Sequence, residues 1–507
     1  METKSRSYHS MMNMLSGYAY QIVMILLMFI SRTVFIYILG VNYLGINSIF
    51  SDILNMLSLA DLGFSSAMTY SFYKPIAEGD QKQIAALVGF YKKIYTVIAV
   101  AISVIGICLI PFLDYIVNVK QPIDYLNVYY ILSLANVVAS YLFVFKTAII
   151  VADQRNYIIN KINIITNVLK TIIQIIGLVM FKNYILYLVI AVGFTFFTNF
   201  VSSHKAEKLY PFIKEKIVLE ESEKKAIFST LRSVFVYKFS TVLLNATDNT
   251  IISIILGTTV VGYYSNYFMI SNKTVQIVAL LFTSLTASIG NIIVKEKSEK
   301  RYEIFFIEQT ISYIVSGIVV SCFVVLVNDL VGVWLGKEFQ LSIGVVLVIG
   351  LNLYLSIVLQ PLWSYREATG LYVKTKWIML YAAIINIILS ILLGLKIGLA
   401  GILLASAIAR LATYVWYEPM VLFREYFEVS AKKYFFTLIN NGLATICITF
   451  LLLIIGSHIM VDSWIMLIIK GIFCCFFSAI VFLLIYRKSK GIKLLKNKAK
   501  AMMKNRR

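Results

Sequence analysis

The chain is 507 residues long, 60% hydrophobic and only 14% charged, with a mean hydropathy of +0.84 and a net charge of +21. So few charged residues cannot cover the surface of a soluble domain, so that class is excluded. The apolar residues form long blocks near the ~20 residues that cross a bilayer as a helix. Lipid cannot satisfy free backbone groups, and the blocks do not alternate as barrel strands do. We therefore predict an all-α integral membrane protein.

The hydrophobic blocks predict about fourteen transmembrane helices, using a ~20-residue window. In chain order these spans are 11–38, 44–72, 84–112, 123–150, 157–181, 184–203, 227–256, 260–293, 302–328, 341–365, 372–394, 398–423, 434–456 and 463–486. The first span follows a short head that carries Lys4 and Arg6, and no small-residue cleavage site comes after the span. We expect it to be a retained helix rather than a signal peptide.

The basic residues fall on alternate connections between these spans. One set, which includes both ends of the chain, holds most of the 46 lysines and arginines. The other set holds four: Lys120, Lys182, Lys337 and Lys396. The positive-inside rule then places both termini in the cytoplasm. The excess charge is explained by topology and by contact with anionic membrane lipids, and no nucleic-acid-reading module accompanies it.

An internal repeat relates the two halves of the chain. Gly40 and Gly45 pair with Gly257 and Gly262 at an offset of 217, and Ala152 pairs with Ala368 at 216. The register holds through several spans and loops, which indicates a duplicated six-helix unit. Because six is even, both copies have the same orientation, as in transporters whose two lobes rock against each other around a shared site.

The repeat predicts two pseudo-symmetric six-helix lobes and an appended helix pair. The predicted parts are an N-terminal lobe 1–203, a cytoplasmic linker 204–226, a C-terminal lobe 227–423, an additional helix pair 424–486 and a basic cytoplasmic tail 487–507.

Some basic residues lie inside the predicted spans, where a lone charge costs about 2.5–3.5 kcal/mol and usually faces a cavity or a partner. Arg32, Lys238 and Lys273 lie away from the span ends, so we expect them to line a cavity that suits an anionic group such as a diphosphate. Lys470 and Arg410 are instead expected to snorkel to the membrane interface.

Polar stripes at helical spacing extend this predicted cavity. The candidate binding residues on them are Gln21, Lys170, Asn245, Asn249 and Asn266. The alternative is that the uncharged members only join helices through hydrogen bonds. Span five carries a regular stripe of this kind, formed by Asn160, Asn163, Asn167, Lys170 and Gln174.

Three carboxylates, Asp52, Asp61 and Asp248, also lie within predicted spans. They are candidates for binding a coupling ion or balancing the cavity charge, with intramolecular ion pairs as the alternative. Coupling to Na+ or H+ stays open. The cysteines and histidines show no metal-ligand or disulfide spacing, so we expect no metal and no cofactor.

The segment RTVFIYILGVNYLGINSIFSDILNMLSLADLGFSSAMTYSFYKPIAEGD (32–80), with TDNTIIS (247–253), VGYYSNY (261–267) and SLTASIGN (284–291), resembles bacterial polysaccharide-biosynthesis flippases. These belong to the multidrug/oligosaccharidyl-lipid/polysaccharide exporter superfamily. The resemblance covers the whole chain. It implies two six-helix lobes, a cationic central cavity, and transfer of undecaprenyl-diphosphate-linked oligosaccharide to the outer leaflet of the bacterial plasma (inner) membrane. The cavity arginine of the family's first helix corresponds to Arg32.

We therefore expect a non-enzymatic flippase for the repeat units of a surface polysaccharide (capsule, O-antigen or exopolysaccharide), working with glycosyltransferases and a polymerase. Within the superfamily, a drug/cation antiporter is the alternative, although its cavity would favour acidic residues, and a peptidoglycan-precursor flippase would use the same chemistry. A membrane-embedded polymerase or glycosyltransferase is the rival from another class. The short outer connections and the absence of a DxD metal pair disfavour it.

Overall fold

The structure is a computed structural model that describes residues 6–58, 64–118, 123–283, 289 and 296–495. This described part is helical and contains no strand, which confirms the all-α prediction. The chain divides into two compact units, Met1–Gly262 and Tyr263–Arg507. The predicted lobe and linker boundaries at 203, 226 and 423 stay predictions.

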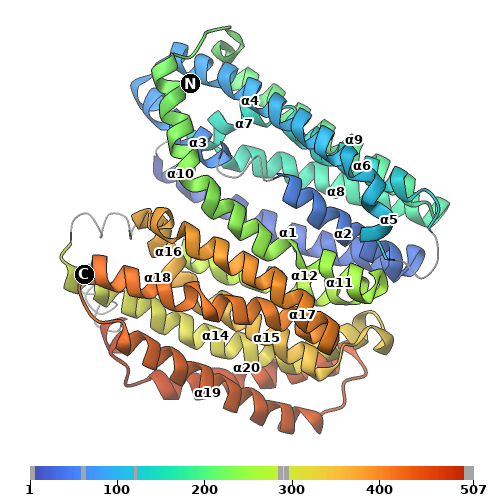
Figure 1. Ribbon diagram of the computed structural model, residues 1–507, viewed down its shortest axis with the longest axis vertical. Helices are drawn as coiled ribbons and strands as arrows, with labels where there is room; N and C mark the ends of the chain where they lie inside the picture. The colour runs from blue at the N-terminus through green and yellow to red at the C-terminus, as the bar shows by residue number, and fades with distance from the viewer. Residues whose placement is uncertain (1–5, 59–63, 119–122, 284–288, 290–295, 496–507) are drawn as a thin grey trace. The chain divides into compact units, whose positions relative to one another are not determined.

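The first unit is built from long helices joined by short connections (Figure 1). They are α1 (Arg6–Leu39), α2 (Val41–Leu57), α3 (Phe64–Glu78), α4 (Gln81–Cys108), η2 (Ile110–Phe112), α5 (Leu113–Ile116), α6 (Leu126–Tyr141), α7 (Val144–Ala152), α8 (Asn156–Phe181), α9 (Tyr184–Leu209), η3 (Pro211–Lys214), α10 (Glu221–Ala246) and α11 (Asp248–Leu256). Helix α1 packs along α8, α8 along α9, and α9 along α6. The first turn of α12 (Thr258–Thr283) also belongs to this unit.

The second unit is organised around α14, which is 37 residues long and whose most apolar stretch is largely buried. Its helices are α14 (Ser298–Trp334), η4 (Lys337–Phe339), α15 (Ile343–Val358), α16 (Gln360–Thr369), α17 (Tyr372–Ala412), α18 (Tyr414–Leu422), the π-helical turn η5 (Phe423–Phe427), α19 (Lys432–Ser457) and α20 (Trp464–Tyr486). Helices α15, α19 and α20 all pack on α14.

The repeat read from the sequence is visible in the helix bounds of the two units. Helices α6 and α15 start and end at the same offset of 217, and α4 and α14 start at that offset. Residues with positive φ also recur in pairs: Gly40 with Gly257, Gln154 with Gly370, and Lys182 with Gly398. Left-handed backbone is rare outside glycine, so three such pairs at an offset of 216–217 are strong evidence for duplication.

Equivalent bends and contacts support the same conclusion. The chain bends by 46° between α6 and α7 and by 41° between their counterparts α15 and α16. The hydroxyl of Tyr210 donates to Asp153 Oδ2 at 2.5 Å, and the hydroxyl of Tyr426 donates to the carbonyl oxygen of Thr369 at 3.2 Å. Both pairs sit at the offset of 216.

Nine helices in the described part are long and apolar enough to cross a membrane, or up to eleven if each bent pair is one span. The predicted count of fourteen is not confirmed by this measure. Ile22, Leu26 and Ile30 on α1 each expose more than half of their surface at a spacing of four residues, as expected for a lipid-facing stripe. The chain is a multi-pass membrane protein.

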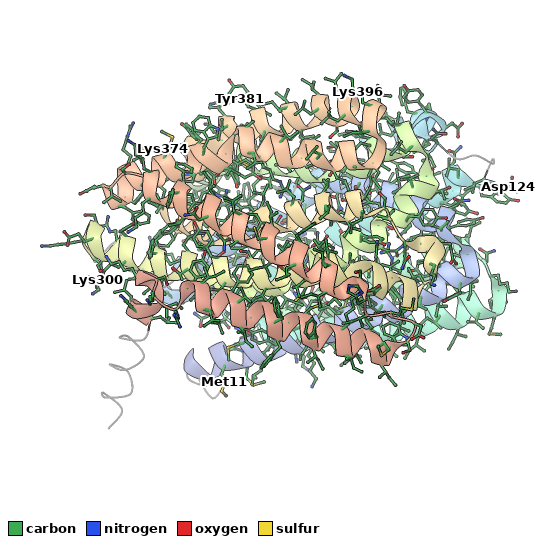
Figure 2. All side chains as sticks on the ribbon, turned by 90° about the horizontal axis from the view of Figure 1, so that it is seen from below. Met11, Asp124, Lys300, Lys374, Tyr381 and Lys396 are labelled. Atoms are coloured by element: carbon green, nitrogen blue, oxygen red, sulfur yellow. The ribbon has the colours of Figure 1, made fainter. Side chains whose placement is uncertain are left out.

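Residues labelled in Figure 2 show the two ends of the helices in each unit. In the second unit, Figure 2 shows Lys300 and Lys374 toward one end and Lys396 toward the other. In the first unit, Met11 and Asp124 lie toward opposite ends of the same view. The alternation of charge between connections and the assignment of one end to the cytoplasm stay predictions.

Candidate functional site

Arg32 is half-buried inside the first unit, on the part of α1 that packs along α8. It interacts electrostatically with Tyr187 of α9. The side chains of Tyr187 and Ser31 are hydrogen-bonded, and Gln174 Nε2 of α8 donates to the Tyr187 carbonyl oxygen at 3.0 Å. Arg32 thus lies near Tyr187 inside a helical unit. A guanidinium in such a place is suited to bind an anionic group.

Aromatic side chains continue this cluster toward the start of α9. Phe35 packs edge-on against Tyr184 and Tyr187, with ring centroids 5.6 and 5.2 Å apart. Tyr184 also lies 4.8 Å from Tyr129 and 5.4 Å from Tyr43. These five residues come from α1, α2, α6 and α9, and the sequence analysis missed them. The spacing of Tyr184 and Tyr187, three residues apart on one helix, was the signal available.

The polar stripe of α8 serves mainly to join helices. Asn160 Nδ2 donates to Ser16 Oγ of α1 at 3.0 Å, whereas Asn167 Nδ2 bonds within α8 itself, to the Asn163 carbonyl oxygen at 2.8 Å. The 3.0 Å bond from Gln174 links α8 to α9. The helix-joining alternative therefore holds for Asn160 and Gln174. Lys170 and Gln21 are half-buried, and their predicted binding role stays a prediction.

Asp52 and Asn249 meet where α2 packs against α11. Asn249 Nδ2 donates to Asp52 Oδ2 at 2.8 Å, and the backbone N–H of Asn249 bonds to the same carboxylate. Asp248 acts on Asp52 electrostatically as a second negative charge. Two of the three predicted carboxylates thus lie together, while Asp61 lies outside the described residues.

The other predicted cavity residues are less informative. Lys238 of α10 is half-buried. Lys273 Nζ donates to Gln276 Oε1 on its own helix at 2.8 Å, and Asn266 is fully buried. Asn245 lies on α10, but its side chain is outside the described part of the chain. Their roles stay predictions.

The structure corrects two expectations about basic residues near span ends. Lys470 of α20 does not snorkel: it is 5% exposed, and its Nζ lies 2.7 Å from Asp329 Oδ2 of α14. Arg410 is also turned inward, donating from NH1 to Ser356 Oγ at 3.0 Å. Each has a partner on a neighbouring helix: a carboxylate pairs with Lys470, and a hydroxyl group accepts a hydrogen bond from Arg410.

The second unit also contains a buried ion pair that the sequence analysis missed. Arg366 NH1 donates to Glu418 Oε1 at 2.9 Å and to Oε2 at 3.1 Å, joining α16 to α18. Arg366 lies just beyond the predicted span 341–365, and only the packing of two distant segments reveals its partner. Among the described residues, no group of three or more His, Cys, Asp or Glu side chains is arranged to hold a metal ion.

Solved transporter structures share this fold. Lipid II flippase MurJ, in an inward closed conformation, superposes with a TM-score of 0.65 and 14% identity over 93% of this chain and 98% of that chain. A mutant of the Vibrio cholerae MATE transporter VcmN superposes with a TM-score of 0.56 and 14% identity over 82% of this chain and 98% of that chain. An inward-facing multidrug resistance MATE family transporter of the MOP superfamily superposes with a TM-score of 0.51 and 13% identity over 77% of this chain and 93% of that chain.

The chain has the fold of MOP-superfamily transporters. No family model and no curated protein matches the sequence. At 13–14% identity, these structures show the MOP fold alone. The substrate must therefore be argued from the residues of this chain.

Proposed function

We propose that this protein is a flippase that moves an undecaprenyl-diphosphate-linked oligosaccharide from the inner to the outer leaflet of a bacterial plasma membrane by alternating access. Such repeat units are used for capsule, O-antigen or exopolysaccharide synthesis. The observation that carries the proposal is Arg32, an arginine held half-buried near Tyr187 inside a membrane-spanning unit.

An arginine is costly to place in a membrane, so it is retained where it has a partner of opposite charge. Its planar guanidinium binds phosphate oxygens through two parallel hydrogen bonds, which a lysine cannot do. The neighbouring hydroxyl groups of Tyr184 and Tyr187 are suited to a sugar. The prenyl chain of the substrate would stay in lipid.

The further cations proposed along the substrate path are Lys170, Lys238 and Lys273. The proposed hydrogen-bonding groups are Gln21, Asn245, Asn249 and Asn266.

The proposed working parts are the lobes 1–203 and 227–423, the linker 204–226, the helix pair 424–486 and the tail 487–507. Both termini are proposed to be cytoplasmic, where glycosyltransferases supply the substrate. A polymerase would consume it on the other side.

The MurJ likeness favours a second candidate with the same chemistry, a flippase for a lipid-linked peptidoglycan precursor. A drug antiporter, as in the MATE structures, is disfavoured by the basic character of the predicted cavity residues. The two flippase candidates differ only in the sugar.

Deletion of the gene in its host tests the proposal. A membrane-impermeant sugar label applied to spheroplasts reports which leaflet holds the lipid-linked oligosaccharide. We expect the intermediate to accumulate on the cytoplasmic leaflet, and to be cleared by the wild-type gene but not by Arg32→Ala. An intermediate that never forms, or that reaches the outer leaflet unpolymerised, would show that the protein is an enzyme acting before or after the flip.

A further inference from the structure

Helix α19 lies at an edge of the second unit, where it packs on α14 and α20 (Figure 1). Its inner face is buried against these helices and contains Tyr434 and Leu452. The opposite face is exposed along the helix, and Phe436, Leu443 and Phe450 each expose more than half of their surface. Lipid tails are as apolar as these side chains, so the apolar part of this face needs no protein partner.

The polar residue Asn440 interrupts this apolar face. It is exposed, between Phe436 and Leu443, and its side chain forms no hydrogen bond with another residue in the described part of the chain. Its neighbour Asn441 is fully buried and joins α19 to α15, since Tyr354 Oη donates to Asn441 Oδ1 at 2.9 Å. The packing of α19 within its own unit is therefore explained by Asn441, and Asn440 is turned away from it.

The amide of Asn440 lies at the depth of the hydrocarbon layer. Helix α19 is 26 residues long, which corresponds to about 39 Å, and the hydrocarbon layer is ~30 Å thick. Asn440 lies about 12 Å along the helix axis from the first residue, Lys432. An asparagine side chain is too short to reach the membrane interface from there, as a lysine would. Because an unpaired amide is unfavourable in lipid, we expect a group outside this chain to satisfy it.

The spacing of exposed residues on α19 indicates what that group is. Six exposed side chains recur at alternating intervals of four and three residues, which is the heptad pattern of helices that pair along a seam. We name these residues the α19 seam: Phe436, Asn440, Leu443, Cys447, Phe450 and Ile454. In such a pattern, a single asparagine specifies the register and the number of the paired helices.

A second copy of this chain fits the α19 seam. Copies of one chain cross a membrane in the same orientation, so a twofold axis along the membrane normal brings α19 against α19 in parallel. Residues at the centre of a twofold interface meet their own counterparts. An amide carries both donors and an acceptor, so two Asn440 side chains can satisfy each other, and hydrogen bonds of this kind join membrane helices.

We propose that the α19 seam is the interface of a parallel homodimer whose register is set by a pair of Asn440 amides. Helix α19 lies outside the two predicted lobes, which end at 423. The inference therefore does not rest on the proposed function, and the oligomeric state of the protein tests it without a transport assay.

Cys447 of the α19 seam allows a cross-linking test without any introduced residue. Copper–phenanthroline is added to membrane vesicles that contain the full-length protein, and it joins two adjacent thiols as a disulfide when each thiol gives up a proton and transfers one electron to copper(II). We expect wild type to form a disulfide-linked dimer, which is lost in Cys447→Ser. Cys475→Ser, a matched change at an exposed cysteine of α20, should still cross-link. No cross-link in wild type, or one that survives Cys447→Ser, would overturn the proposal.

The amide pair is tested by energy transfer between donor- and acceptor-labelled copies in vesicles of increasing lipid content. Asn440→Leu should weaken association by about tenfold, because it removes the hydrogen bonds between the helices. Asn440→Gln keeps an amide and should associate nearly as wild type does. The Tm of Asn440→Leu at high lipid dilution should match that of wild type, which separates lost association from unfolding.

The homodimer would be rejected if wild type were monomeric at every dilution, or if Asn440→Leu associated as tightly as wild type. A monomer whose Cys447 cross-links to a different protein in native membranes would place another protein on the α19 seam and also reject the homodimer. Failure of flipping with the dimer intact would count against the proposed function only.

Discussion

A Cβ atom added to Gly45 of α2 would lie 2.2 Å from the carbonyl oxygen of Thr258, at the start of α12. The reciprocal contact is also present, since a Cβ on Gly262 would lie 2.4 Å from the carbonyl oxygen of Val41. Between them, Thr259 Oγ1 donates to Asn42 Oδ1 at 2.7 Å. Positions 41, 42 and 45 are the repeat equivalents of 258, 259 and 262, so the two copies contribute the same contact to each other. Small residues allow such close backbone approach in membranes.

Gly45→Ala should therefore destabilise the protein by about 1–3 kcal/mol, because the new methyl group meets a backbone oxygen that cannot move aside. The measurement is the Tm of the purified protein in detergent. Gly193→Ala is the matched control, because a Cβ at Gly193 of α9 meets nothing within 4 Å. That change should be neutral or stabilising by up to about 1 kcal/mol. Equal effects at the two sites would contradict the close crossing.

Lys470→Met should destabilise the second unit by about 3 kcal/mol, because it removes the partner of Asp329 and leaves that carboxylate uncompensated. Thermal unfolding of the variant measures the loss. The double variant Lys470→Met/Asp329→Asn should recover much of it, since no unpaired charge remains. A double variant as unstable as the single one would show that the lysine acts through packing and not through the ion pair.

Ionisation of the Tyr210 hydroxyl should make the protein less stable at high pH. Burial and, next, its hydrogen bond to Asp153 raise the pKa of the Tyr210 hydroxyl above its ordinary value of 10.0. A raised folded-state pKa means that the stabilisation is fully present below about pH 10 and is lost as the pH rises above that value. The Tm of wild type should thus fall above about pH 10 more steeply than that of Tyr210→Phe. Parallel curves for the two proteins would contradict this assignment.

Much of the fold was predictable because hydropathy and the residues that begin or end a helix are local properties of the sequence. The predicted span 157–181 corresponds to α8, and the break between the spans 372–394 and 398–423 corresponds to the non-helical Ile397 and Gly398 within α17. The repeat offset found from a few glycines also relates the bounds of whole helices.

The partners of buried charges were not predictable, because they depend on which distant helices pack together. Span nine was predicted to end at 328, which left Asp329 in a loop, whereas α14 continues to Trp334 and presents Asp329 to Lys470. The contact between Asp52 and Asn249 likewise joins residues 197 positions apart. Periodicity identified both residues as buried polar groups but could not pair them.

The most direct test of the flippase proposal is a reconstituted assay with a fluorescent lipid-linked oligosaccharide and an impermeant quencher. The account predicts that wild-type protein carries the diphosphate-linked substrate across the bilayer, and that Arg32→Gln is slower by about tenfold or more, since it loses a charged hydrogen-bonding partner. Lys396→Gln, at an exposed lysine of the second unit, should flip as wild type does. The flippase proposal would be contradicted if vesicles with wild-type protein transferred the substrate no faster than protein-free vesicles. It would also be contradicted if Arg32→Gln transferred the substrate as fast as wild type.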